Sequence, residues 1–477
     1  MIGFDYFQTI AMRSYAYVCL IKLRWLIIAV QLLAGTLVAF QLIFLYTIVG
    51  GDYDEDYRAF VRVYREQYRR DVPPGMENWH SFAVAQRCSL HAGYMQINED
   101  LSRLRSAAAV HNEWKAGDIP MELVHAAAKL ELTTRISVAE GKVHPPAGYH
   151  MILMQKFAHL LPDTEFVINN LDEPRIFADY NMNSSSQNDS SVKASYANIQ
   201  EALQIACRDP SYLDRNMEWH GFLIKPASGP ASLQGKYPIF SGTKLNDCFY
   251  DIMYPNRYFW DAARTLDRES SFKYDPFSIR FAKQYPFSER PDGVFWRGST
   301  TGGGLRTDRW LQNQRIRLVE KFGRTEEIGD HVKVDVGFHK ILQCEPHCDR
   351  IQKQFEIKPS VPTADACKAN KFMIDVDGNT FSQRFATLME CGALVLKSTL
   401  FTTWMDDIVH PWTHYIPISL DYQDIQDRIH WAQRYRNEAN RIASAGASAA
   451  TQRLRTEDME CYMYRLLLEY TRLLGRR

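Results

Sequence analysis

The chain has 477 residues, of which 46% are hydrophobic and 23% are charged. This length and composition allow two or more domains with large cores. The 56 basic side chains are balanced by 56 acidic ones, so the formal net charge is zero. A dedicated nucleic-acid-binding protein usually carries a basic excess, and the balance therefore argues against nucleic acid as a partner.

The N-terminal part of the chain predicts a membrane anchor. Residues 25–49 contain no charged side chain and are long enough to span a bilayer as a helix. Basic residues precede this segment and acidic residues follow it, which predicts a cytosolic N-terminus. We expect a cytosolic tail over residues 1–24, a transmembrane signal anchor over residues 25–49 and a stem over residues 50–70. The hydrophobic run is too long for a cleavable signal peptide, and no small-residue cleavage pattern ends it.

Eight of the nine cysteines follow the predicted anchor: Cys88, Cys207, Cys248, Cys344, Cys348, Cys367, Cys391 and Cys461. An even number in an oxidising compartment permits up to four disulfides, and the sequence does not give their pairing. Cys344 and Cys348 have a spacing that zinc ligands use, but no second close pair of Cys or His accompanies them. Sequons at Asn183 and Asn188 lie in a polar run that predicts an exposed, glycosylated loop.

Beyond the stem, the hydrophobic pattern predicts helices and strands in alternation. Helical patterns run to about residue 140, including residues 121–140, and a strand over residues 165–168 follows. In the second half we expect strands over residues 293–296, 331–336, 371–376 and 393–397, and helices over residues 306–322, 381–391, 421–436 and 456–474. This alternation predicts an α/β architecture with two halves and a cleft between them.

A small-residue loop follows the strand that ends at Trp296. Arg297 is followed by Gly-Ser-Thr-Thr-Gly-Gly-Gly, which ends at Gly304. Glycines let the backbone approach an anion closely, and the hydroxyl groups of Ser299 and Thr300 add donors. The pattern is neither a Walker loop nor a dinucleotide fingerprint. A flexible turn with a structural arginine is the alternative interpretation.

A second loop follows the strand over residues 371–376. It contains Asp375, Asp377, Gly378, Thr380, Ser382 and Arg384. We expect Thr380 or Ser382 to cap the following helix, and Arg384 to hold a phosphate group with two parallel hydrogen bonds. The two spaced acids resemble a metal-binding Asp-x-Asp pattern. The alternative is an Asp-Gly turn in which Asp375 bonds to the backbone.

A third candidate lies at the end of the strand over residues 165–168. Asp172 follows this strand, where catalytic carboxylates of α/β folds often lie, and Pro174 prevents the strand from continuing. A carboxylate there would face a cleft and act as a general base. The alternative is a local ion pair between Asp172 and Arg175.

With these motifs in hand, the chain resembles glycosyltransferase family 90, the capsule-associated and Rumi-like transferases, and its fungal branch most closely. The resemblance runs from about residue 71 to the C-terminus. It is carried by Pro73–Trp79, Leu171–Arg175, Phe295–Gly302, Asp375–Phe385, Leu396–Thr399, Pro411–Pro417 and Glu457–Leu466.

The resemblance implies a GT-B fold, in which two Rossmann-like domains face a cleft. The expected domains are an acceptor-side domain over residues 71–280, a UDP-sugar-binding domain over residues 281–440 and a C-terminal helix over residues 441–477 that packs back on them. It also implies an inverting transferase with a UDP-sugar donor, a glycan or glycoprotein acceptor, and Golgi or ER residence through the anchor as a single-pass type II membrane protein.

The resemblance also assigns roles to residues. Asp172 matches the catalytic base of the family's animal members, and Arg384 matches their diphosphate-binding arginine. The donor site is expected to comprise Trp296, Arg297, Gly298, Ser299, Thr300, Asp377, Gly378, Ser382 and Arg384. Animal members have Asn and Arg where Asp375 and Asp377 stand, so no metal ligand is assigned and a requirement for Mn²⁺ stays open.

The donor sugar is the least constrained part of this prediction. By analogy with the fungal capsule enzymes we expect β-xylosyl transfer from UDP-xylose, with UDP-glucose as the alternative donor. A non-catalytic glycan-binding relative is a further alternative. A glycosidase that uses Asp172 and Glu173 as its acid pair is disfavoured, because adjacent strand residues point to opposite faces.

Overall fold

The computed structural model describes residues 55–110, 119–130, 132–177, 233–234, 237–245, 249–261, 281, 284–302 and 310–475. The predicted tail, the predicted anchor and both sequons lie outside these residues. Among the described residues, no helix combines the length and the apolar character that a membrane span requires. Residues 55–68, in the predicted stem, are helical. The chain divides after Val72, and all elements below belong to the unit of residues 73–477.

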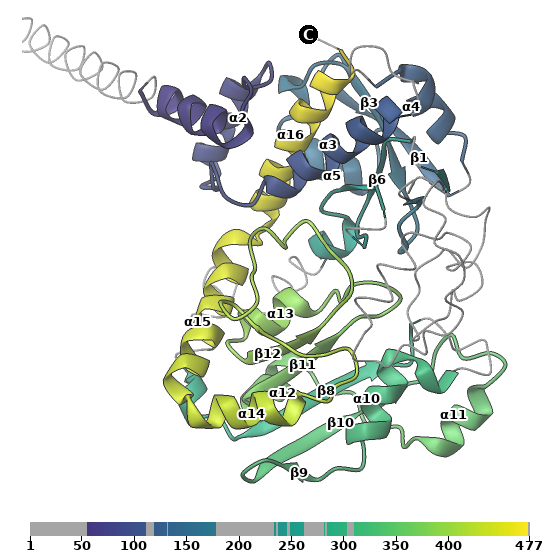
Figure 1. The fold of residues 1–477 in the computed structure, drawn as a ribbon, viewed down its shortest axis with the longest axis vertical. Coiled ribbons are helices and arrows are strands. Elements are labelled where there is room, and N and C mark those ends of the chain that lie inside the picture. The colour runs from purple at the N-terminus through teal and green to yellow at the C-terminus, as the bar shows by residue number, and fades with distance from the viewer. Residues whose placement is uncertain are drawn as a thin grey trace, which may run out of the picture. The chain divides into compact units, whose positions relative to one another are not determined.

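The first half of this unit is built on a five-stranded sheet, here called the N-terminal sheet (Figure 1). Its strands are β1 (Thr133–Ala139), β2 (Lys142–His144), β3 (Thr164–Asn169), β6 (Ile239–Ser241) and β7 (Ile252–Met253). The order is β2-β1-β3-β6-β7, with β3, β6 and β7 parallel and the β1–β2 hairpin antiparallel to β3. A separate parallel pair joins β4 (Ile176–Phe177) to β5 (Leu233–Gln234).

The helices of this half are α2 (Met76–Ala85), α3 (Met95–Val110), α4 (Met121–Ala127), α5 (Tyr149–Met154) and the 3₁₀ turn η1 (Ala158–Leu160). The predicted helix over residues 121–140 is wrong in its second half, because α4 ends at Ala127 and β1 follows. The β-branched residues of β1 favour a strand, and Ile136 and Val138 alternate with less buried neighbours.

The second half is built on a six-stranded sheet, here called the C-terminal sheet. Its strands are β8 (Gly293–Ser299), β9 (Glu327–Ile328), β10 (Val332–Lys340), β11 (Phe372–Val376), β12 (Leu394–Ser398) and β13 (Ile416–Pro417). The order is β13-β12-β11-β8-β10-β9, and only β9 runs antiparallel to its neighbour. The predicted strands over residues 293–296, 371–376 and 393–397 are confirmed.

This strand order fixes where a ligand site is expected. The chain passes from β8 to β10 on one side and later reaches β11 on the other side of β8. The strand order therefore reverses between β8 and β11, and in open parallel sheets ligands bind in the crevice outside the carboxyl ends of such strands. The loops that follow β8 and β11 leave the sheet at this crevice.

Helices cover the C-terminal sheet: α10 (Gln314–Phe322), α11 (Cys348–Gln354), α12 (Thr363–Ala369), α13 (Phe385–Glu390), α14 (Ile425–Arg434) and α15 (Arg436–Arg453), with 3₁₀ turns η4 (Phe287–Glu289) and η5 (Trp310–Gln312). All five residues of β11 and of β12 are buried, as expected for parallel strands with both faces covered. The predicted helix over residues 421–436 is shorter than expected, since α14 begins only at Ile425 and ends at Arg434.

The last helix, α16 (Thr456–Leu473), returns to the first half. It packs against α2, α3 and α5, whereas α15 packs against α13 and β12 (Figure 1). A disulfide between Cys88 and Cys461 joins the end of α2 to α16. The first and last helices of this unit therefore both belong to its first half.

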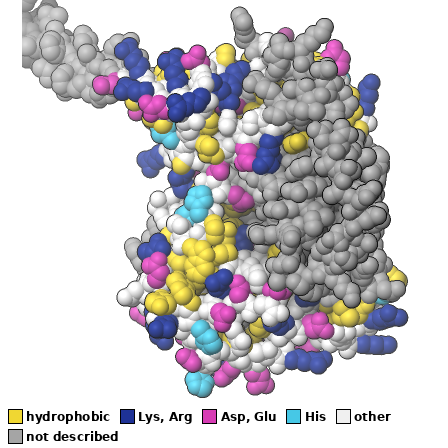
Figure 2. Space-filling view, viewed as in Figure 1, with side chains coloured by type: hydrophobic (Ala, Val, Ile, Leu, Met, Phe, Trp, Pro, Cys, Tyr) yellow, Lys and Arg dark blue, Asp and Glu magenta, His cyan; other side chains and the backbone are white. Residues whose placement is uncertain are grey.

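Two more disulfides lie around the C-terminal sheet. Cys344 pairs with Cys348, and Cys367 pairs with Cys391. The Cys344–Cys348 pair forms a disulfide and not a zinc site, while Cys207 and Cys248 lie outside the described residues. On the face shown in Figure 2, basic and acidic side chains of the described residues are interspersed, as the balanced net charge leads one to expect.

Candidate active site

The strand β8 places the aromatic side chain of Trp296 and the basic side chain of Arg297 on opposite faces of the sheet. Trp296 is buried on one face, and the guanidinium groups of Arg315 and Arg384 lie 5.8 and 5.9 Å from its ring. A Cβ atom at Gly298 would meet the Trp296 ring at 2.5 Å, so only glycine fits beside it. The strand runs through Ser299, so Gly298 and Ser299 belong to β8 and not to the predicted loop.

Arg297 points to the other face and is largely engaged by the protein. Its Nη2 donates to both carboxylate oxygens of Asp335, at 2.8 and 2.7 Å, and its Nε donates to the carbonyl of Pro359 at 3.1 Å. The remaining Nη1 is buried and has no partner among the described residues. Most of the charge of Arg297 is thus neutralised by Asp335, and the NH₂ group of Nη1 remains without a partner among the described residues.

The loop after β11, here called the β11 loop (residues 377–384), is fixed by two buried carboxylates. Asp375 accepts from Lys397 Nζ at 2.9 Å and from the hydroxyl of Ser382. Asp377 accepts from Thr399 Oγ1 at 2.6 Å and from the Leu400 amide at 2.8 Å, and burial raises its pKa to about 7.

These bonds correct two predictions for the β11 loop. Ser382 binds Asp375 and caps no helix, and Asp375 bonds to side chains and not to the backbone. Both acids are held by protein donors. Within the described residues, no three side chains of His, Cys, Asp or Glu gather as a metal site.

Arg384 directs its guanidinium group back toward β8. Its Nη1 donates to the carbonyl of Arg297, and its Nη2 is buried without a partner in the described part of the chain. Burial lowers the pKa of Arg384, because the charged form loses solvation and only Asp375 opposes this effect. A buried guanidinium with a free N–H group favours an anionic ligand.

A third arginine, Arg315, was not identified from the sequence. It lies at the start of α10, whose N-cap Asn313 accepts from the amides of Arg315 and Ile316. Its Nε donates to the Asp377 carbonyl at 2.8 Å, and its Nη1 donates to Thr301 Oγ1 at 2.7 Å. Arg315 therefore joins the loop after β8 to the β11 loop. Burial first, and then the charge of Arg384, lower its pKa to about 10.

Gln314 reinforces this junction, and Thr300 takes a different role from the predicted one. The side-chain amide of Gln314 donates to the carbonyls of Asp377 and Gly378 at 2.9 and 3.0 Å. The hydroxyl of Thr300 donates to the Leu342 carbonyl at 2.6 Å and accepts from its amide at 2.8 Å. Thr300 is fully buried, so its hydroxyl fixes the loop and does not point to a ligand.

A cavity of about 180 Å³ opens beside these arginines. Among the predicted donor residues, Trp296, Arg297 and Arg384 line it, together with His339. Its remaining wall is mainly apolar: Phe295, Val361, Ala366, Met373, Ile374 and Leu388. Burial, and then the charge of Arg384, lower the pKa of His339. An apolar pocket with convergent polar groups at one side is the usual form of a small-molecule site.

Asp172 reaches this crevice from the N-terminal sheet. It lies in the segment between β3 and β4, here called the β3 loop (residues 170–175). Its Oδ2 accepts from Asn379 Nδ2 at 3.2 Å, and its carbonyl accepts from Thr380 Oγ1 at 3.2 Å. The charge of Asp172 is also the main reason that the pKa of Tyr258 is raised. The predicted carboxylate and the predicted β11 loop therefore meet in space.

The comparison with known sequences identifies the family. Residues 223–477, just over half of the chain, match the sequence model of glycosyl transferase family 90. The chain belongs to glycosyl transferase family 90. The predicted family is thereby confirmed, whereas its fungal branch stays a prediction. The matched region includes the whole C-terminal sheet, and Asp172 lies before it.

Several family 90 relatives are animal proteins. The human Protein O-glucosyltransferase 1 is 26% identical over 260 residues, which cover 52% of this chain and 60% of that protein. The Danio rerio Protein O-glucosyltransferase 2 is 32% identical over 241 residues, or 50% of this chain and 44% of that protein. The Aedes aegypti O-glucosyltransferase rumi homolog is 26% identical over 283 residues, covering 57% and 61%. The chain thus spans less than two thirds of the length of these relatives.

Among solved structures, Anabaena HepE in complex with UDP-glucose is similar at 12% identity with a TM-score of 0.27. The match covers 61% of this chain and 71% of that one. A TM-score this low does not establish a shared fold.

Proposed function

We propose that this family 90 member is an inverting glycosyltransferase that transfers glucose from UDP-glucose to an acceptor hydroxyl, with Asp172 as the general base. The observation that carries the proposal is the bond between Asp172, from one sheet, and Asn379 in the β11 loop of the other, because that loop ends at Arg384, whose Nη2 is buried. Both lie at the crevice where the strand order of the C-terminal sheet reverses.

The guanidinium cluster supports a diphosphate leaving group. Arg384 Nη2 and Arg297 Nη1 are buried N–H donors without protein partners among the described residues. The charge that gathers on UDP as the sugar leaves would be stabilised by donors that are already in place. Arg315 would act indirectly, because its own N–H groups already bind both the loop after β8 and the β11 loop.

The cavity beside Arg384 supports a sugar donor that carries a nucleoside next to its diphosphate. Its apolar wall between β8 and β11 suits the face of a pyrimidine base, and Arg384 at its side would bind the phosphate that follows. Asp377 and Ser382, which the sequence assigned to donor contacts, would act indirectly by shaping the β11 loop, as would Asp375. Because protein donors hold both acids, the proposed mechanism uses no Mn²⁺.

The carboxylate of Asp172 supports a single displacement. It would take the proton from the acceptor hydroxyl as that oxygen attacks the anomeric carbon, while the bond to UDP breaks on the opposite side. This displacement inverts the anomeric centre, so an α-linked donor gives a β-linked product. The bond from Asn379 would hold one carboxylate oxygen and thereby orient the other toward the acceptor.

The relatives favour glucose over the predicted xylose. The human, Danio and Aedes proteins are all named as O-glucosyltransferases, and two of them as protein O-glucosyltransferases. By this likeness the acceptor is a hydroxyl group of a glycoprotein. The two sheets would form the donor and acceptor sides of a GT-B arrangement. The three disulfides among the described residues support an oxidising compartment, so we retain the secretory pathway, with the predicted anchor over residues 25–49.

The test is a comparison of the full-length chain with its Asp172→Asn variant. The wild type should release UDP from UDP-glucose, and the variant should lose at least about 99% of this rate. UDP affinity, measured by calorimetry, should stay within about twofold, because Asp172 contacts the β11 loop and not the arginines. A variant that releases UDP at the wild-type rate would show that Asp172 is not the base.

A further inference from the structure

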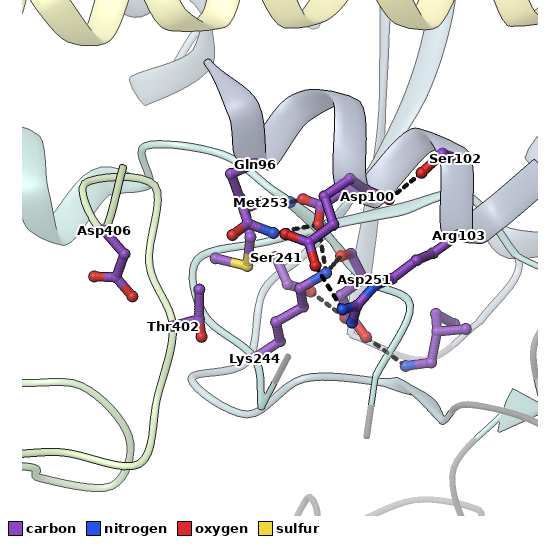
Figure 3. Close-up of polar contacts among 12 residues, drawn as sticks. Gln96, Asp100, Ser102, Arg103, Ser241, Lys244, Asp251, Met253, Thr402 and Asp406 are labelled. Carbon is purple, nitrogen blue, oxygen red and sulfur yellow. Dashed lines mark hydrogen bonds and ion pairs between the residues drawn. The ribbon is translucent and has the colours of Figure 1, made fainter. Parts of the chain in front are cut away.

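A buried polar cluster underlies the β3 loop, outside the residues that the proposed reaction uses. It consists of Asp100 on α3, Ser241 at the end of β6, Lys244, and Asp251 just before β7. All four are at most 1% exposed. Figure 3 shows Lys244 reaching toward Asp100 and Asp251, and Lys244 Nζ lies 2.5 Å from Asp100 Oδ1.

Burying two carboxylates and one ammonium group is costly for stability. Hydrophobic residues of similar volume often stabilise a core as well as a buried ion pair does, so such pairs are weak evidence for a stabilising role. The bonds of this cluster show what it does instead. Asp251 accepts the backbone N–H groups of Arg175 and Ile176, and Asp100 accepts that of Met253, so the cluster fixes where these backbone segments lie.

Asp251 makes the bonds that matter for the proposed reaction. Its Oδ1 accepts from the Arg175 amide at 2.9 Å, and its Oδ2 accepts from the Ile176 amide at 2.7 Å. These two amides end the β3 loop, three and four residues after Asp172. Ser241 Oγ donates to Asp251 Oδ1 at 2.5 Å and fixes the orientation of the carboxylate.

The other end of the β3 loop is tied to the same place. Asn169, the last residue of β3, donates from Nδ2 to the Glu173 carbonyl at 2.6 Å and to Ser241 Oγ at 3.1 Å. Ser241 therefore connects both ends of the loop, through Asn169 on one side and Asp251 on the other. Asp172 lies between these two attachments.

The cluster also connects to the donor side. The backbone of Lys244 pairs with Thr402, with N–H···O distances of 3.2 and 2.8 Å. Thr402 belongs to the segment that begins with Thr399 and Leu400, which bind Asp377 in the β11 loop. The backbone from Leu400 to Thr402 thus links the β11 loop to Lys244, whose Nζ donates to the Asp251 carbonyl at 3.0 Å.

We infer that Asp251 is a positioning residue, which holds the β3 loop so that the carboxylate of Asp172 stands at a fixed place relative to the β11 loop. The inference rests on the proposed function, because it assigns Asp251 to the same reaction. Asp251 takes no part in the chemical step. Two N–H bonds to one carboxylate set both the position and the direction of the chain at residues 175 and 176.

The first experiment compares Asp251→Asn with a matched control, Asp406→Asn. Asp406 is also a buried aspartate that accepts from a backbone amide and a hydroxyl, both of Thr403, and these two bonds lie in the segment of Thr402 and not in the β3 loop. An asparagine at 251 has only one acceptor oxygen and turns an NH₂ group toward one of the two amides. We expect kcat for UDP release from UDP-glucose to fall about tenfold or more in Asp251→Asn, with KM and UDP affinity within about twofold.

Hydrogen–deuterium exchange supplies a readout that does not depend on activity. The amides of Arg175 and Ile176 should exchange faster in Asp251→Asn than in the wild type or in Asp406→Asn. Should Asp251→Asn fold poorly, Ser241→Ala provides a milder change, since it removes only the hydroxyl that orients Asp251. That variant should show a smaller fall in kcat and the same local rise in exchange.

The outcomes separate the inference from the proposed function. A folded Asp251→Asn or Ser241→Ala variant with wild-type kcat overturns the inference alone. So does an equal loss of kcat in Asp251→Asn and Asp406→Asn, because the effect would then follow general destabilisation. A wild-type chain that releases UDP from no UDP-sugar overturns the proposed function, and the inference falls with it.

Discussion

Asn379 donates a hydrogen bond from Nδ2 to Oδ2 of Asp172, over 3.2 Å and across 207 positions of the sequence. Asn379 follows β11 of the C-terminal sheet, and Asp172 follows β3 of the N-terminal sheet. The bond therefore ties the loop proposed to hold the donor to the carboxylate proposed to activate the acceptor. Thr380 adds a second bond, to the Asp172 carbonyl.

Replacing Asn379 with alanine should slow the reaction without weakening the binding of UDP. A hydrogen bond to a charged group contributes about 1.5–3 kcal/mol, so losing the orientation of Asp172 should lower kcat by about 10-fold to 100-fold. Steady-state UDP release gives kcat, and calorimetry gives UDP affinity. Asn170→Ala, at an exposed asparagine in the same β3 loop, is the control and should leave kcat unchanged. An unchanged kcat in Asn379→Ala would mean that this bond does not orient the base.

Replacing Arg384 and replacing Arg315 should affect UDP affinity and Tm to different extents. Arg384→Ala removes the unpartnered Nη2 donor and should weaken UDP binding by about 10-fold to 100-fold, with a smaller fall in Tm than Arg315→Lys, because it loses a single bond to the protein. Arg315→Lys keeps a positive charge but loses the forked bonds to both loops, and should lower Tm as well as UDP affinity. Calorimetry and thermal unfolding measure the two effects, with the exposed Arg350→Ala as control. Equal UDP affinity in Arg384→Ala and the wild type would contradict the assigned donor site.

The buried pair of Lys397 and Asp375 should matter for stability. Lys397→Met leaves the fully buried Asp375 carboxylate without its ammonium partner, which should destabilise the fold by about 3–5 kcal/mol. The double variant Asp375→Asn with Lys397→Met should recover part of this loss. Lys368→Met, which breaks the exposed pair with Asp365, should cost no more than about 1 kcal/mol. Urea unfolding compares the three, and a loss in Lys397→Met as small as that of the control would contradict the assignment.

Glu173 should make stability depend on pH. Burial is the main cause that raises its pKa from 4.5 to about 7, so the folded state binds a proton that the unfolded state has lost. Stability from this group is present below pH 4.5 and is lost as the pH rises toward 7. The gain of Glu173→Gln over the wild type should therefore grow between these values, to at most about 3 kcal/mol. Tm measured against pH tests this, and the exposed Glu122→Gln should show no such trend.

The strands around the site could be predicted because burial leaves a strong pattern. β11 and β12 are covered on both faces, so their residues form short, nearly continuous apolar runs. The start of the helix α15 at Arg436 was not predicted, for the opposite reason. It packs through small residues, and a Cβ atom at Gly446 would meet the His414 carbonyl at 2.4 Å. Alanine and glycine facing a neighbour give little hydrophobic periodicity.

The site itself divides in the same way. Asp172 and Arg384 stand in recognisable motifs, and the sequence predicts both as site residues. Their partners Asn379 and Arg315 were not predicted, because their roles come from contacts between segments that are distant in sequence. The side-chain roles of Thr300 and Ser382 were assigned to a ligand, whereas burial turns both hydroxyls toward the protein.

The most direct test of the central proposal is UDP release by the full-length chain from UDP-glucose and from UDP-xylose, measured for the wild type and for Asp172→Asn. The account predicts faster release from UDP-glucose by the wild type, and loss of that release in the variant. Release that is faster from UDP-xylose would contradict the donor assignment. Release that persists in Asp172→Asn would contradict the assignment of the base.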